Sequence, residues 1–248
     1  MHEYIRYFRS DLYKLRHSWF FPVHFIFPVC GAVLMLLYAK ISNSKDLNKL
    51  AAFLQIIALA YPFVVSVVCQ MTAEQEKHAG HSQNMLTLPS RGKAIFSKFT
   101  VLISSGLLST ALSTVLFGNL FPLLTGARLP SEFFITVPAV LWSSNLLLYG
   151  LHLILAFRFG PNLGISVGVV GSLLSALLQT GLGTGVWYLI PYGLGIRFAE
   201  STLTKMFQLP AGSSFELHIG IIFCISATCV MIGIMMLWFF RYSGTSTD

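Results

Sequence analysis

Charged side chains are missing from six long stretches of this chain. No Asp, Glu, Lys or Arg occurs in residues 17–39, 50–73, 99–127, 133–157, 159–196 or 217–240. A helix of about 20 mostly apolar residues crosses the hydrocarbon core of a bilayer, and these stretches lack the polar face that a soluble helix shows. We therefore expect an all-α membrane protein with six transmembrane helices. The remaining loops are too short for a soluble domain, so residues 1–248 are expected to form one membrane domain.

Motifs for nucleotide binding and for hydrolysis are missing as well. Gly92-Lys93 is followed by Ala94 and belongs to no GxxxxGK[ST] phosphate loop, and the chain has no HExxH motif and no GxSxG motif. The uncharged stretches hold no carboxylate or lysine to activate a nucleophile or to bind a coupling ion. We therefore expect no enzymatic activity and no cofactor in this chain, and an energy source in another protein.

Cysteine pairs and complete metal-ligand sets are also lacking. The four cysteines fall in or beside apolar stretches, without a CxxC pair, and are expected to be free, buried thiols: Cys30, Cys69, Cys224 and Cys229. Glu74, His78 and His81 would share one side of a helix, but no further Cys or Asp completes a typical site. We expect no bound metal.

Positive charge is in excess, with a formal net charge of +7. Basic residues at the edges of membrane helices fix topology and contact anionic lipid headgroups, so this excess indicates membrane lipids as partners and no nucleic acid. Ten of the 16 lysines and arginines lie in the N-terminal segment, the second loop, the fourth loop and the C-terminal tail. The positive-inside rule then predicts that both termini are cytoplasmic.

The N-terminal 17 residues combine an apolar stripe with charges. Apolar side chains recur at spacings of three and four: Tyr4, Ile5, Phe8, Leu12, Leu15 and Trp19. The opposite face is expected to hold Glu3, Arg6, Arg9, Asp11 and Lys14. This pattern predicts an amphipathic helix over residues 1–17 that lies in the membrane interface. A basic tail that only sets topology would need the charges but not the stripe.

Proline and glycine positions refine the expected spans. We predict spans over about 18–39, 50–70, 99–122, 133–155, 164–188 and 217–240. Prolines that free backbone groups and often mark kinks fall in three of them, namely Pro22 and Pro28 in the first, Pro62 in the second and Pro138 in the fourth. Gly164 and Gly168 have the spacing of a close helix contact. Residues 191–210 are expected to be an extracellular interfacial or re-entrant segment, with an ordinary outer loop as the alternative.

The second loop, residues 71–98, is the most informative polar segment. Glu74, Glu76 and Lys77 begin a helical turn, and an apolar edge of Met85, Leu86 and Leu88 follows before Pro89 ends the pattern. A short amphipathic cytoplasmic helix of this kind docks in a groove on a soluble partner. The alternative is a solvated loop that only links two spans.

These features resemble a known family of transporters. The six spans, the N-terminal helix and a second loop with Glu76, Gly80, Met85-Leu86-Thr87-Leu88-Pro89 and Lys98 resemble ABC-2 type exporter permeases. The segments YIRYFRSDLYKLRHSWFFPVHFIFP and WYLIPYGLGIRF are similar to permease subunits of lantibiotic-immunity ABC transporters, of the MutG-like kind. The resemblance covers essentially the whole chain.

The resemblance implies an ABC-2 or type V exporter-like fold in the bacterial plasma membrane. It implies a P-loop ATPase partner that binds ATP and Mg, a second, similar six-span permease, and an amphipathic antimicrobial peptide as substrate. The residues that would couple to the ATPase are Glu74, Glu76, Lys77, Gly80, Met85, Leu86, Leu88 and Pro89. An ABC-2 permease for a bacitracin-like peptide, a lipid or a drug, and a non-transporting scaffold or sensor subunit, are the alternatives.

Overall fold

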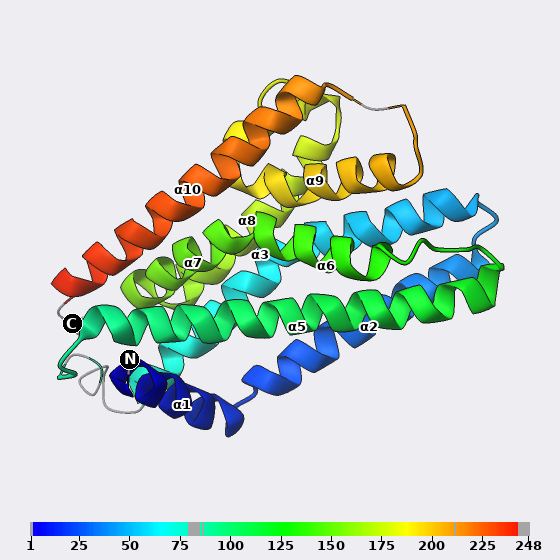
Figure 1. Ribbon diagram of the computed structural model, residues 1–248. Helices are drawn as coiled ribbons and strands as arrows, with labels where there is room; N and C mark the ends of the chain where they lie inside the picture. The colour runs from blue at the N-terminus through cyan, green and yellow to red at the C-terminus, as the bar shows by residue number, and fades with distance from the viewer. Residues whose placement is uncertain (1, 79–84, 86, 211, 243–248) are drawn as a thin grey trace.

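The chain folds into a bundle of helices, several of them longer than a bilayer is thick. The computed structural model describes residues 2–78, 85, 87–210 and 212–242. The helices are α1 (His2–Arg16), α2 (Phe20–Ile41), α3 (Asp46–His78), α5 (Arg91–Thr125), α6 (Phe133–Ser144), α7 (Leu146–Phe159), α8 (Pro161–Gln179), α9 (Pro191–Met206) and α10 (Ser214–Arg241). α1 and the end of α10 lie at the same end of the bundle (Figure 1). Every regular element in the described part of the chain is helical.

Five of these helices are long and apolar enough to cross a membrane. They are α2, α3, α5, α8 and α10, and the pair α6–α7 passes the same test together although it bends by 40°. The bend falls at Asn145, which is buried and donates from Nδ2 to the Leu141 carbonyl at 2.7 Å. The protein is therefore a multi-pass membrane protein, with five candidate spans among the described residues, or six if the bent pair crosses as one.

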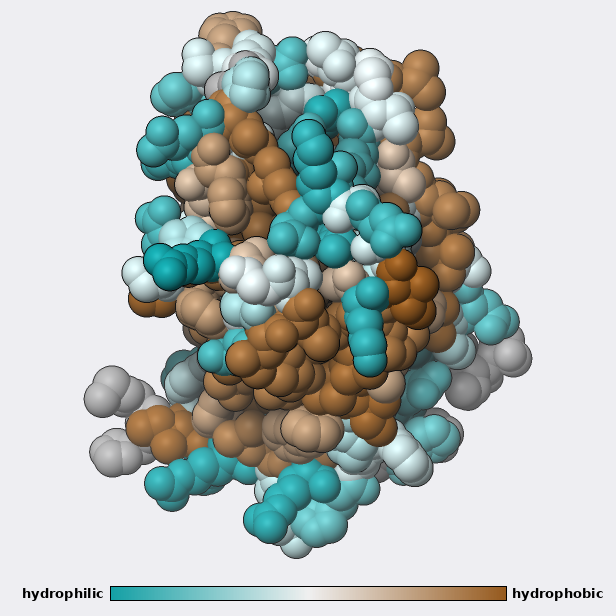
Figure 2. Space-filling model, turned by 90° about the vertical axis from the view of Figure 1, so that its right-hand side faces the viewer, coloured by the Kyte–Doolittle hydropathy of each residue, from teal (hydrophilic) through white to brown (hydrophobic). Residues whose placement is uncertain are grey.

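Apolar side chains on the outside of the bundle agree with a lipid environment. Figure 2 shows a broad apolar patch with hydrophilic side chains above and below it. α2 and α10 expose many large apolar side chains, among them Phe25, Leu34, Ile222, Ile225 and Leu237. A soluble monomer rarely exposes so much contiguous apolar surface, whereas lipid tails cover it without cost.

The second loop is shorter than predicted, because both flanking helices continue into it. α3 runs 33 residues to His78 and α5 begins at Arg91. At 1.5 Å per residue each exceeds the roughly 30 Å hydrocarbon core. Residues 71–78 therefore extend α3, and Glu74, Glu76 and Lys77 do not begin a separate helix.

The fifth apolar stretch differs most from its predicted form. The predicted span over 164–188 is wrong at its end, because α8 ends at Gln179 and two 3₁₀ turns follow at Gly181–Gly183 and Trp187–Leu189. The expected short outer pieces are instead one helix, α9, which buries Leu194, Ile196 and Leu203. α9 packs beside α3, α6 and α8.

Glycines on α8 allow its close contact with α3. A Cβ added at Gly168 would lie 2.1 Å from Ser66 Oγ and 3.2 Å from the Pro62 carbonyl, and one at Gly164 would lie 3.3 Å from Gln70 Oε1. A larger residue at Gly168 requires movement of α3, whereas one at Gly164 requires only a small shift of the Gln70 side chain. The spacing of the two glycines therefore serves the contact that the sequence pattern predicts.

Candidate functional site

α1 is attached to the start of α5 at one end of the bundle. Tyr4 donates its hydroxyl to Thr100 Oγ1 at 2.8 Å, and Lys93 Nζ lies 2.7 Å from Glu3 Oε2. The hydrogen bond and charge of Lys93 lower the pKa of the Glu3 carboxyl. Tyr7 and Leu15 are buried. The N-terminal segment is thus a packed helix and not only a basic tail, while its place at a membrane interface stays a prediction.

A buried charge cluster joins α1, α3 and α5 at this end. We use this name for Asp11, Lys14, Glu76 and Lys98 together. Lys98 Nζ lies 2.6 Å from Asp11 Oδ1 and 2.7 Å from Glu76 Oε1. Lys14 Nζ donates to the same Glu76 oxygen at 2.8 Å. Three helices that are distant in sequence therefore meet at one alternating set of two cations and two carboxylates.

The central members of the charge cluster are withdrawn from solvent. The side chains of Glu76, Lys98 and Asp11 are 1%, 4% and 9% exposed. Ser97 Oγ adds a hydrogen bond to Asp11 Oδ2 at 2.5 Å. Burying such charges costs several kcal/mol per ion unless each is paired, so removing one partner is strongly destabilising. The cluster holds the three helices in one geometry.

A cavity of about 230 Å³ adjoins the charge cluster. It is lined by Tyr7, Ser10, Asp11, Lys14, Glu76, Met85, Leu88, Ala94 and Lys98. Within the described residues, the Tyr7 hydroxyl and Glu76 Oε2 are buried without a hydrogen-bond partner. A polar cavity of this size has room for water molecules that would satisfy both atoms. The cavity also brings two residues of the second loop against α1 and α5.

The predicted coupling residues divide between this cavity and its surroundings. Glu76, Met85 and Leu88 line the cavity, whereas Glu74 bonds Gln70 Nε2 at 3.2 Å and lies outside it. Lys77 also lies outside the lining, and Pro89 is exposed. Gly80 and Leu86 lie outside the described residues. The expectation that Glu76 faces a soluble partner is wrong, because its side chain is 1% exposed and paired inside the protein.

Asp11 is a second correction. We expected it on the exposed polar face of the N-terminal helix, but it is buried and accepts hydrogen bonds from Lys98 and Ser97. Its position three residues after Phe8 and four before Leu15 places it on the apolar stripe. An acidic residue inside an otherwise apolar stripe is the signal that would have predicted a buried partner. Lys98 and Lys14 were missed as members of the charge cluster, and Ser97 was missed as a hydrogen-bond donor to Asp11.

Potential metal ligands and thiols are dispersed among the residues that the structure describes. Among the residues that the structure describes, no three His, Cys, Asp or Glu side chains gather as a metal site, and His81 lies outside them. All four cysteines are free, and Cys69 and Cys224 are buried as expected. Cys30 and Cys229 are exposed, contrary to the prediction, on apolar helices that face outward.

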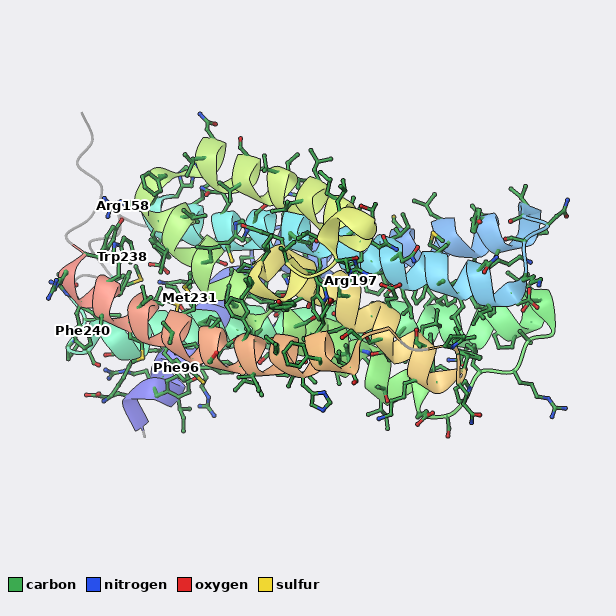
Figure 3. The ribbon with its side chains drawn as sticks, turned by 90° about the horizontal axis from the view of Figure 1, so that it is seen from above. Phe96, Arg158, Arg197, Met231, Trp238 and Phe240 are labelled. Carbon is green, nitrogen blue, oxygen red and sulfur yellow. The ribbon has the colours of Figure 1, made fainter. Side chains whose placement is uncertain are left out.

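A second polar region lies between α9 and the start of α10. Figure 3 shows Arg197 about halfway along the bundle, whereas Arg158, Trp238 and Phe240 lie at one end. Arg197 donates to the carbonyls of Leu178 at 2.8 Å and of Thr180 at 2.9 Å, where α8 ends. A cavity of about 480 Å³ opens beside it and is lined also by Glu200, Lys205 and Glu216, among others. Arg197 thus caps α8 and borders a polar hollow.

Comparison with known proteins gives one match. Residues 8–156, more than half of the chain, match the family described as ABC-2 family transporter protein. The matched part holds α2, α3, α5 and α6, more than half of α1, most of α7, and every member of the charge cluster. Comparisons with curated proteins and with solved structures give no match.

Proposed function

The chain belongs to the ABC-2 family of transporter proteins, and on that premise we propose that it is the permease subunit of an ABC exporter for a lantibiotic or similar antimicrobial peptide. The family is a membrane transport component that works with a separate ATPase. In this proposal the exporter removes the peptide from the membrane and gives self-immunity or resistance. A second, similar six-span permease completes the membrane part of the complex.

One observation carries the coupling part of the proposal. Met85, in the second loop, is 2% exposed and lines the cavity of the charge cluster together with residues of α1 and α5. A partner that pushes on this loop therefore pushes on a well-anchored side chain. Because the cluster joins α1, α3 and α5 by buried charge pairs, the displacement reaches three helices together.

The cargo assignment is supported by the chemistry of the spans. The uncharged stretches offer no acidic or basic pocket for a hydrophilic solute. An amphipathic peptide that already lies in the membrane needs no such pocket, because lateral movement from the lipid brings its apolar face to the helices. The similarity of residues 4–28 and 187–198 to lantibiotic-immunity permeases favours this cargo over a bacitracin-like peptide, a lipid or a drug.

The partners are tested by purification of the tagged chain from its native membranes in a mild detergent, followed by mass spectrometry. We expect a P-loop ATPase and a second six-span protein in stoichiometric amounts. Recovery of the chain alone, or only as a homo-oligomer after crosslinking, would contradict the heteromeric exporter and favour a scaffold or sensor subunit.

The coupling role is tested by Leu88→Asp in cells challenged with the peptide. Leu88 is half-buried at the rim of the charge-cluster cavity, and loss of an interface anchor lowers affinity on the order of tenfold or more. We expect a comparable loss of resistance with normal membrane insertion. Leu129→Asp, at a half-buried leucine between α5 and α6, is the matched control and keeps resistance. Equal resistance in both variants would refute coupling through this loop.

A further inference from the structure

A cavity of about 110 Å³ lies among α2, α3, α5 and α7. Its lining is His24, Phe27, Pro28, Gly31, Ile56, Ile57, Ala60, Tyr61, Val64, Gly106, Ser109, Thr110, Ser113 and Tyr149. The residues of α3 and α5 that line the cavity come from the middle portions of these two long helices. The cavity is therefore expected at the depth of the hydrocarbon core, and no member of the charge cluster lines it.

Prolines interrupt the backbone hydrogen bonds of two helices at this level. Pro28 has no N–H to bond the His24 carbonyl, and Ser109 Oγ donates to that carbonyl instead at 2.8 Å. In α3, which contains Pro62, the Phe63 N–H bonds Ser172 Oγ at 3.2 Å. Hydroxyl groups from other helices thus satisfy the backbone where the prolines disturb it. Pro28 and Ser109 of the first interruption line the cavity, and Tyr61 and Val64 of the lining flank the second.

Hydroxyl groups with spare bonding capacity face the cavity. Ser113 is 2% exposed, and its Oγ has no hydrogen-bond partner among the described residues. Tyr149 donates to Tyr61 at 3.5 Å, and Tyr61 lies 3.3 Å from Thr110. Both distances exceed the usual O–H···O value of about 2.8 Å. These weak bonds leave the hydroxyls free to turn toward a ligand.

His24 supplies an acceptor on the same lining. Its Nδ1 lies 2.8 Å from the Phe20 carbonyl, which can only accept. In the neutral ring Nδ1 therefore carries the proton and Nε2 keeps a lone pair. An apolar cavity with a hydroxyl and an imidazole acceptor suits an apolar group that carries one hydrogen-bonding atom.

The cavity opens between α2 and α3. Phe27 and Ile56, on these two helices, are 42% and 47% exposed at its rim. Since exposed apolar side chains of spanning helices face lipid, a molecule dissolved in the bilayer reaches the cavity without crossing water. An apolar cavity of about 150 Å³ holds benzene, so a cavity of 110 Å³ that opens toward lipid accommodates one apolar group of at most about that size and not a whole peptide.

We propose that this cavity binds one apolar group of the transported cargo, about the size of an aromatic side chain and carrying an atom that hydrogen-bonds Ser113. The inference rests on the proposed export function and names the part of the cargo that the chain recognises. A lipid chain is the weaker occupant, because its hydrocarbon interior has no atom to bond an orphan hydroxyl at this depth.

Photolabelling of the purified chain in lipid nanodiscs tests the site without the ATPase. The probe is a benzyl alcohol that carries a diazirine, and mass spectrometry locates the label. Gly31→Leu fills the cavity, because nothing lies within 4 Å of a Cβ at Gly31, and we expect labelling of the lining to fall on the order of tenfold. Gly233→Leu is the matched control, since its Cβ is equally free of neighbours on the exposed side of α10.

Ser113→Ala is expected to lower labelling about fivefold through the lost hydrogen bond.

Competition identifies the occupant. An excess of a cationic amphipathic peptide that contains phenylalanine is expected to displace the probe, and an excess of dioleoylphosphatidylcholine is not. Displacement by the lipid alone, or equal labelling of Gly31→Leu and Gly233→Leu, would overturn the proposal. Failure of the export function appears separately, as purification without an ATPase, and leaves these labelling results unchanged.

Discussion

Two regions of the molecule, the α1 end of the bundle and the α8–α9 segment, are held by opposite means. At the α1 end, four charged side chains join three helices, with central separations of 2.6 and 2.7 Å between Lys98 and its carboxylates. In the α8–α9 segment, glycines allow close backbone contact, and a Cβ at Gly183 would lie 2.0 Å from the Leu178 carbonyl. Charge pairs fix distances between distant helices, whereas glycines bring neighbouring segments together. The first arrangement suits the transmission of motion, and the second suits a compact fold inside the membrane.

Removal of the central cation is expected to have the largest effect. Lys98→Met leaves Asp11 and Glu76 without their shared partner, and breaking a buried pair costs about 3–5 kcal/mol. The free energy of unfolding in detergent, followed by thermal or chemical denaturation, measures this loss. In the double variant Lys98→Met/Glu76→Gln one of the two carboxylates left without Lys98 is replaced by a neutral amide. This variant should recover part of the lost free energy of unfolding. A Lys98→Met protein as stable as wild type would show that the charge cluster does not hold the α1 end together.

Overpacking of the α8–α9 turn ranks second. Gly183→Ala forces the new methyl group against the backbone of Leu178, and such strain costs about 1–3 kcal/mol. Gly181→Ala, two residues earlier, meets nothing within 4 Å and is the matched control. Denaturation midpoints of the two variants provide the comparison. If both are equally stable, close approach at Gly183 does not determine this segment.

Loss of the arginine cap on α8 should be smaller and more local. Arg197→Met removes the donors to Leu178 and Thr180, and unsatisfied carbonyls there cost about 1–3 kcal/mol, less where water reaches them. We expect faster hydrogen exchange at the end of α8 and in α9, with unchanged exchange in α1. Uniformly faster exchange across the bundle would assign Arg197 a global role instead.

The exposed pair between Glu3 and Lys93 should matter least. Both side chains are almost half exposed, and solvent-exposed pairs contribute little. The pKa of Glu3 is lowered in the folded protein. Any stabilisation of the fold by this pair is therefore fully present above the ordinary carboxyl pKa of about 4.3, and it is lost as the pH falls through the lowered pKa of Glu3. Glu3→Gln is therefore expected to leave the melting temperature at neutral pH unchanged, and a clear drop would give this pair a role that exposure does not predict.

The helical spans were predictable, and their ends were not. Six uncharged stretches predict a multi-pass helical membrane protein, because the bilayer requires apolar length whatever the partners are. The end of α8 depends on the glycines after Gln179 and on the Arg197 bonds to Leu178 and Thr180, which join residues 17 or more positions apart. Uncharged composition alone contains no information on where such a helix stops.

The candidate site was predicted only in part. The second loop and Glu76 were singled out from the sequence, but as a surface for a partner. The burial of Glu76 depends on Lys98, which is 22 residues away, and on Lys14, which is 62 residues away. Pairings over such distances come from helix packing and do not appear in local spacing. Asp11 alone carried a local signal, as the acid within the apolar stripe of α1.

Site-specific photocrosslinking tests the central claim, that this permease receives its ATPase at the second loop. A photoreactive amino acid replaces Pro89, which is exposed beside the charge-cluster cavity, or Ser131, which is exposed in the loop between α5 and α6. The account predicts a crosslink from position 89 to a P-loop ATPase and none from position 131. Crosslinking from both positions alike, or from 131 only, would contradict it.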